Sequence, residues 1–201
     1  MYVKETLKKT VETVTGMGKP SFEEARDAVR RVTPETILFS DDGITPNNPR
    51  LPFIYYPGAV ELSPYQDPAA IFEDLFHRHD WNKSWRNGIY DYLHYHSRTH
   101  EVLGIARGAA RVRFGGDKGR ILEIRAGDVA ILPAGTGHQC LAASSNLLVV
   151  GAYPPQGSYE ECRGTAAEHA RAARSIADVP VPASDPIYGK DAGLTEIWRR
   201  E

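Results

Sequence analysis

Residues 88–108 read GIYDYLHYHSRTHEVLGIARG, with three of the chain's seven histidines and a glutamate set among Tyr, Leu, Val and Ile. These surrounding residues favour strands. On a strand, residues two apart point to the same face, so His94 and His96 are expected to aim their imidazoles together. Glu101 opens the next β-like run after a short turn, which would place a carboxylate beside them. Such a cluster can hold a metal, perform acid–base chemistry or simply decorate a sheet.

A second segment, residues 127–138 with the sequence GDVAILPAGTGH, ends in another histidine after a predicted strand and a Pro-Gly turn. In order and spacing, the first segment follows G-x-x-x-x-x-H-x-H-x-x-x-x-E-x-x-x-x-x-x-G and the second G-x-x-x-x-x-P-x-G-x-x-H. Both segments resemble the two signature motifs of the cupin superfamily. The asparagine that often follows the last histidine is replaced by Ala142. Over about residues 36–198, the phrases DDGITPNNP and VVGAYPP resemble the single-domain cupins of the YjlB type.

The β-like runs after Gly88 are short and separated by glycine, a pattern typical of an all-β barrel or sandwich. The resemblance implies a mainly β fold: a jelly-roll β-barrel with flanking N-terminal helices and a short C-terminal helix. We expect an N-terminal helical extension over residues 1–35 and a barrel domain over residues 36–201.

Helical periodicity is expected at residues 3–14 and, after the capping box that Ser21 opens, at residues 21–32. A further helix is expected over residues 67–79, inserted into the barrel domain, with Asp67 as N-cap and Pro68 first in the helix. Residues 81–87 are expected to form a loop. Another capping box, Thr165-x-x-Glu168, predicts a helix in the tail, and the prolines after residue 178 indicate an extended strap on the surface.

The resemblance assigns His94, His96, Glu101 and His138 as ligands of one divalent transition-metal ion. Three imidazoles and a carboxylate suit Fe, Mn, Co, Ni, Cu or Zn and match Ca or Mg poorly. Four protein ligands would saturate a tetrahedral zinc ion but leave two positions open around an octahedral ion. Iron, manganese or nickel is therefore favoured, with Zn, Co and Cu as alternatives. In the competing interpretation these histidines are hydrogen-bonded core residues of a cupin that has lost its metal.

Four neighbouring residues complete the predicted site. Tyr90 and Tyr92 share the parity of His94, so they are expected to line the interior, either contacting substrate or filling space. Arg107 shares the parity of Glu101 and is a candidate anion anchor, with an ordinary surface arginine as the alternative. His100 has the opposite parity, which favours hydrogen bonding in support of the site over ligation.

Composition narrows the function classes. The chain has 201 residues, 41% hydrophobic and 25% charged, with a formal net charge of −2. The mixed charges give no case for a nucleic-acid or membrane partner. The N-terminus is too charged for a secretory signal, and the two cysteines are too few for a disulfide scaffold, so we expect reduced thiols in the cytoplasm.

Two function hypotheses follow. The first is a metal-dependent, dioxygenase-type enzyme acting on a small organic molecule. The second is a module that binds a metal or a small ligand without turnover. The resemblance and the apolar stripes of the N-terminal helices also imply a homodimer.

Overall fold

A computed structural model describes residues 22–63 and 65–199, so the helix expected over residues 3–14 lies outside them. In the described ranges nine strands form two antiparallel sheets, of order β1-β2-β7-β4-β9-β3 and β6-β5-β8. The strands are β1 (Glu35–Ile37), β2 (Phe53–Tyr56), β3 (Asn82–Asn87), β4 (Glu101–Arg107), β5 (Ala109–Phe114), β6 (Arg120–Arg125), β7 (Val129–Leu132), β8 (His138–Ala143) and β9 (Leu148–Tyr153). The mainly β, jelly-roll-like fold expected from the sequence is confirmed.

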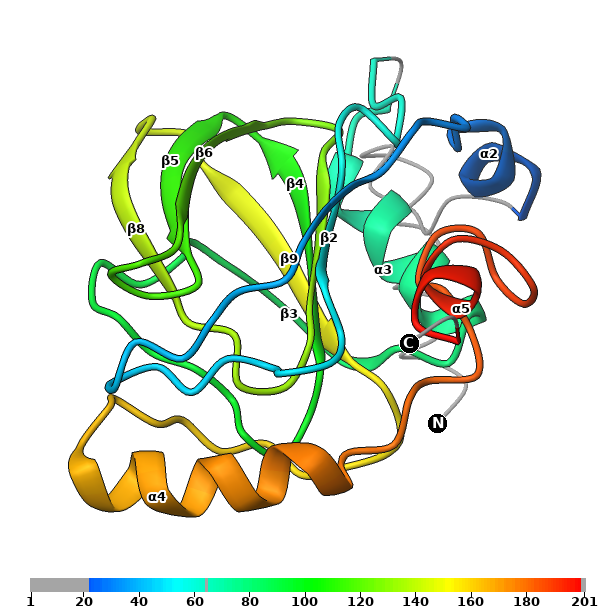
Figure 1. Cartoon of the computed structure of the whole chain (residues 1–201). Helices are drawn as coiled ribbons and strands as arrows, with labels where there is room; N and C mark the ends of the chain where they lie inside the picture. The colour runs from blue at the N-terminus through cyan, green and yellow to red at the C-terminus, as the bar shows by residue number, and fades with distance from the viewer. Residues whose placement is uncertain (1–21, 64, 200–201) are drawn as a thin grey trace, which may run out of the picture.

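The helices lie outside the barrel (Figure 1). They are α2 (Phe22–Asp27), α3 (Pro68–Arg78), α4 (Ala166–Ser175), the 3₁₀ turn η1 (Ile176–Asp178) and α5 (Leu194–Ile197). Figure 1 shows α2, α3 and α5 on one side of the larger sheet and α4 lying across one end of the barrel. The capping box predicted for α4 is present, because the Thr165 side chain accepts from the Glu168 backbone and Glu168 reaches back to it.

Both faces of β4 are covered, which explains why its residues 102–106 are apolar without a break. Leu103 and Ile105 belong to the core between the two sheets, whereas Val102 belongs to the core under α3. Gly104 lets α3 approach closely, since a Cβ there would lie 2.5 Å from the Phe72 ring. Glu101 shares the parity of Leu103, so its side chain points between the sheets.

Two predictions around the first histidines were wrong. Residues 88–93 form no strand, and His94 and Tyr95 make only isolated bridges, to His138 and Cys162. Residues 82–87, expected in a loop, form the edge strand β3. Strand propensity reflects packing of side chains against a surface, and the tyrosines of this segment obtain that packing without a ladder. Tyr90 and Tyr92 stack on each other, and Tyr95 is buried in a small core that includes Ala172 of α4.

The helix expected over residues 21–32 is shorter than predicted, since α2 ends at Asp27. Val29 instead forms a bridge with Val60, and the Glu61 N–H donates to the Ala28 carbonyl. In this segment, backbone pairing with the barrel therefore replaces the helix that the apolar periodicity predicted. The division of the chain at residue 35 remains a prediction.

The C-terminal strap is only partly superficial. Val181 is exposed, but residues 184–187 are buried, and Ile187 belongs to the core under α3. The Asp185 carboxylate is fully buried and accepts four hydrogen bonds, which hold this part of the strap inside. The prolines indicated an extended chain but could not show that an acidic residue ties it to the core.

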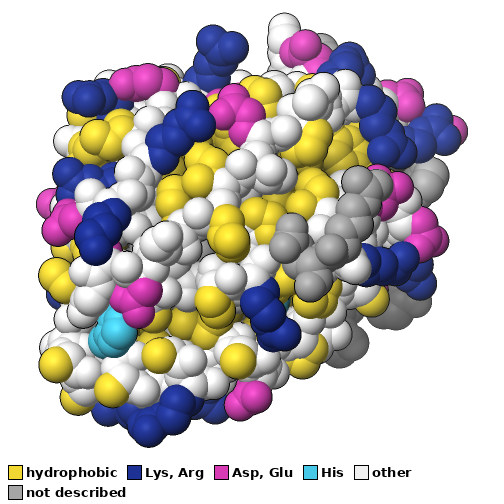
Figure 2. All heavy atoms as spheres, in the orientation of Figure 1, with side chains coloured by type: hydrophobic (Ala, Val, Ile, Leu, Met, Phe, Trp, Pro, Cys, Tyr) yellow, Lys and Arg dark blue, Asp and Glu magenta, His cyan; other side chains and the backbone are white. Residues whose placement is uncertain are grey.

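The surface has no single dominant charge in the view of Figure 2, where acidic and basic side chains alternate around a face with apolar side chains near its centre. Among the described residues, no helix has both the length and the apolar character needed to cross a membrane.

Candidate metal centre

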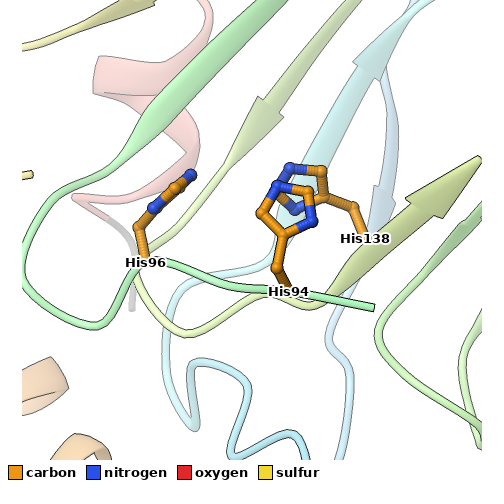
Figure 3. Close-up of side chains that lie close together, drawn as sticks. All are labelled: His94, His96 and His138. Carbon is orange, nitrogen blue, oxygen red and sulfur yellow. The ribbon is translucent and has the colours of Figure 1, made fainter. Parts of the chain in front are cut away.

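Three histidines converge at one end of the space between the sheets (Figure 3). One ring nitrogen of each lies within 4.8 Å of the others. Backbone pairing sets this arrangement, because the His94 N–H donates to the His138 carbonyl and the His138 N–H donates back, at 3.2 and 2.9 Å. The two ring centroids are 4.0 Å apart, and the His96 ring lies 5.7 Å from that of His94.

Glu101 reaches the same point from the first position of β4. Its Oε2 atom lies 3.4 Å from Nε2 of His138 and 3.5 Å from Nε2 of His96. The residue is 2% exposed, and Oε2 has no hydrogen-bond partner in the part of the chain that the structure describes. The structure thus places Glu101 beside two of the three clustered imidazoles, those of His96 and His138.

Backbone carbonyls fix how the imidazoles are turned. The oxygens of Tyr92, Glu160 and Thr136 lie 3.2, 2.5 and 3.4 Å from Nδ1 of His94, His96 and His138, respectively. A carbonyl can only accept, so each Nδ1 carries a proton, and in the neutral imidazole each Nε2 then presents a lone pair. Such bonds set the tautomer in which an imidazole ligates a metal.

Burial and charge favour neutral imidazoles at His94 and His138 and an ionised carboxylate at Glu101. Burial lowers the pKa of His94 and lowers that of His138 to about 3. Burial would raise the pKa of Glu101, but the imidazoles beside it, His96 foremost, lower it to about 2. Burial would also lower the pKa of His96, yet the charge of Glu101 outweighs that effect and raises it. Ionised carboxylate and neutral imidazole are the forms that bind a metal.

The donor set fits a cation. Oε2 of Glu101 faces the Nε2 atoms of His96 and His138, and the distances of 3.5 and 3.4 Å are long for hydrogen bonds. Two ligands held about 2.0–2.2 Å from one ion lie roughly 3.0–3.4 Å apart, close to these separations. The alternative is a proton shared between His96 and Glu101, which would relieve the repulsion between their facing lone pairs.

A cavity of about 390 Å³ opens onto these side chains. This volume is within the usual range for small-molecule sites. Its lining combines the four polar residues with aromatic, aliphatic and basic side chains: Lys83, Trp85, Arg86, Asn87, Gly88, Ile89, Tyr90, His94, His96, Glu101, Leu103, His138, Tyr153 and Tyr159.

Trp85 and Tyr153 were missed by the sequence reasoning. The Trp85 indole N–H donates to the Tyr153 hydroxyl at 2.9 Å, and both line the cavity. The indole lies over Gly151, where a Cβ would be 2.1 Å from the ring. A glycine inside an apolar strand was the available signal, since such glycines mark close approach of another group.

Of the predicted substrate contacts, the structure brings only Tyr90 to the cavity. The Tyr92 ring stacks on Tyr90 with centroids 4.8 Å apart, and its hydroxyl donates to Glu161. Arg107 is exposed and donates to the Gln66 carbonyl, away from the cavity lining.

His100 is fully buried and hydrogen bonds to the backbone through both ring nitrogens. Its Nδ1 accepts from the Ala134 N–H at 3.0 Å, and its Nε2 donates to the Pro180 carbonyl at 3.2 Å. Burial lowers its pKa to about 4. His100 therefore ties the segment after β7 to the C-terminal strap, in agreement with the supporting role expected from its parity.

Comparison with known proteins gives consistent matches. A family model described as cupin matches residues 86–165. A Bacillus subtilis (strain 168) protein, described as the uncharacterized protein YjlB, is 39% identical over 164 residues, which are 82% of this chain and 96% of that protein.

Among solved structures, one of oxalate decarboxylase is 27% identical over 40% of this chain, with a TM-score of 0.33. The matched part spans 22% of the length of that decarboxylase chain. A chain from the crystal structures of DMSP lyases RdDddP and RnDddQII is 17% identical over 41% of each chain, with a TM-score of 0.32.

Proposed function

The chain belongs to the cupin family as a relative of YjlB, and from this premise we propose that it is a metal-dependent enzyme acting on a small organic molecule, with dioxygenase-type chemistry. One observation supports the proposal: three imidazoles converge at a cavity large enough for a substrate, and the Glu101 carboxylate lies beside two of them.

The proposed ligands are the Nε2 atoms of His94, His96 and His138 together with Glu101. An octahedral Fe, Mn or Ni ion bound by these four would keep two positions open. A bound ion of this kind supplies Lewis acidity and open positions for substrate or dioxygen. The adjoining cavity supports this interpretation over a closed structural site, in which no space beside the ligands is needed.

Tyr153 is the side chain best placed to handle a proton. Its hydroxyl accepts the indole N–H of Trp85, and its own O–H is a donor that lies beside the Glu101 carboxylate. Burial and the charge of Glu101 raise the pKa of Tyr153, so the phenol stays protonated at neutral pH. We assign it to hydrogen bonding with the substrate, and Tyr90 to the substrate contact at the cavity mouth.

A non-catalytic module that binds a metal or small ligand is the alternative. Oxygen uptake by the iron- or manganese-loaded protein, with a panel of small organic acids, alcohols and phenols, separates the two functions. We expect uptake with at least one compound and a roughly hundredfold lower turnover number for Tyr153→Phe, as for loss of a proton donor. Tyr188→Phe is the matched control, because the Tyr188 hydroxyl donates to the Arg30 carbonyl away from the cavity. A fully metal-loaded protein that consumes no oxygen with any compound would favour the binding module.

The proposal includes a cytoplasmic homodimer. The two cysteines are free thiols, as a reducing compartment would keep them. Leu38, next to the edge strand β1, is 54% exposed and offers an apolar contact for a second copy. Light scattering that gives a monomer mass would contradict the dimer.

A further inference from the structure

Two cationic side chains, Arg86 and Lys83, line the cavity, and they differ in whether a carboxylate already binds them. Arg86 is neutralised, because its guanidinium contacts Glu73 at 2.7 and 2.8 Å and Asp67 at 3.0 Å. Lys83 also lines the cavity and is exposed, and no carboxylate pairs with it among residues 22–63 and 65–199. The cavity therefore has one cation available for a ligand.

The backbone at Lys83 is unusual for a lysine. Its φ of 54° lies in the left-handed region, and the pairing of β3 with β9 shifts register between Asn82 and Trp85. Such bulges re-aim side chains and are frequent beside active sites. Strained residues of this kind persist only where the surrounding structure fixes them, and they cluster at functional sites.

Two exposed aromatic rings flank the approach to the imidazoles. Tyr90 and Tyr159 are 44% and 52% exposed. The Tyr90 ring lies 5.2 Å from that of His94, and the Tyr159 ring lies 4.9 Å from that of His96. Large aromatic side chains left this exposed at a cavity mouth offer faces on which a flat ligand can pack.

On the basis of the proposed function, we propose that the substrate is a planar aromatic or conjugated carboxylate, with its carboxylate bound by Lys83 and its ring held between Tyr90 and Tyr159. The opposite end of the molecule then points toward the three imidazoles. Lys83 is a specificity-determining residue in this scheme, and it takes the anion-binding role that the sequence suggested for Arg107.

Calorimetric titration of the manganese-loaded protein with cinnamate and with its neutral amide, cinnamamide, tests the proposal. A charge-assisted contact to the carboxylate predicts roughly tenfold tighter binding of cinnamate than of the amide. Lys83→Met should reduce cinnamate binding to the level of the amide, and Lys83→Arg should retain the preference. Lys118→Met, which removes an exposed lysine outside the cavity lining, should behave as the parent protein.

Tyr159→Ala should weaken both probes alike, because it removes a ring face and not a charge. Equal affinity of the parent for the two probes, an unchanged preference in Lys83→Met, or no binding of either probe at millimolar concentration would overturn the inference. Metal content measured on the same samples separates this failure from failure of the proposed function. If the preference for the acid is absent while one equivalent of metal is bound, only the assignment of Lys83 is contradicted. If the preference persists in protein without metal, only the metal-dependent function is contradicted.

Discussion

Replacement of Asp185 by asparagine is expected to destabilise the fold by about 3 kcal/mol. The Asp185 carboxylate accepts from the Tyr56 hydroxyl at 2.7 Å and from the backbone N–H groups of Ile187, Tyr188 and Leu194 at 2.8 Å each. In Asp185→Asn an amide nitrogen replaces one of the two oxygens. In either orientation at least one buried N–H loses its acceptor, at a cost of about 1–3 kcal/mol. The remaining bonds lose their charge assistance, which makes each roughly half as strong.

Tyr56→Phe is the matched variant, because it removes one donor and keeps the carboxylate. Its expected cost is about 1.5–3 kcal/mol, the usual net worth of a hydrogen bond to a charged group. Urea unfolding followed by tryptophan fluorescence measures both changes, since Trp81 and Trp198 are buried in the same core. A value for Asp185→Asn within about 1 kcal/mol of the parent would refute the idea that this carboxylate holds the strap.

Three further predictions concern the barrel, α4 and the metal. Gly151→Ala should displace Trp85, because a Cβ would lie 2.1 Å from the indole. Thermal unfolding should show that the free energy of unfolding falls by about 1–3 kcal/mol, and the tryptophan emission should shift. An unchanged emission would contradict this packing. Thr165→Ala should cost about 1 kcal/mol in urea unfolding by removing the capping box of α4, and a neutral effect would argue against it. Hydrogen bonds from the Thr165 backbone hold the pKa of Glu168 below its ordinary value of 4.5, so this contribution is present above that pH and is lost as the pH falls below it. Metal removal by a chelator should lower the unfolding temperature reversibly. Added metal at one hundred times its dissociation constant should restore about 2.7 kcal/mol of the free energy of unfolding. An unfolding temperature unaffected by chelator or added metal would count against the site.

The sequence predicted the strand-rich fold and the cluster of His94, His96 and His138 better than it predicted the local structure around them. His94 and His96 point to the same site although residues 88–93 form no strand, because the bridge between His94 and His138 fixes the backbone where the ligands are needed. The spacing of a motif indicates which residues come together in the fold. It does not depend on whether the residues between them form a strand or a loop. The parity argument failed for Tyr92 because it requires a regular strand, which residues 88–93 do not form.

Contacts between distant segments could not be predicted from one sequence. Trp85 lies 66 positions before Gly151, and only the pairing of β3 with β9 reveals that the glycine makes room for the indole. The burial of Asp185 likewise depends on Tyr56 from β2. Composition and periodicity describe what a segment prefers, whereas these features arise from which segments become neighbours.

Metal content measured by mass spectrometry on the untagged protein tests the central claim most directly. The parent and His169→Ala, which removes a histidine paired with Asp41 away from the cavity, should each contain about one equivalent of Fe, Mn or Ni. His138→Ala should contain almost none, because it removes one of four converging ligands. The absence of bound metal from all three proteins, even after reconstitution with each of these ions, would contradict the claim that the four side chains form a metal centre.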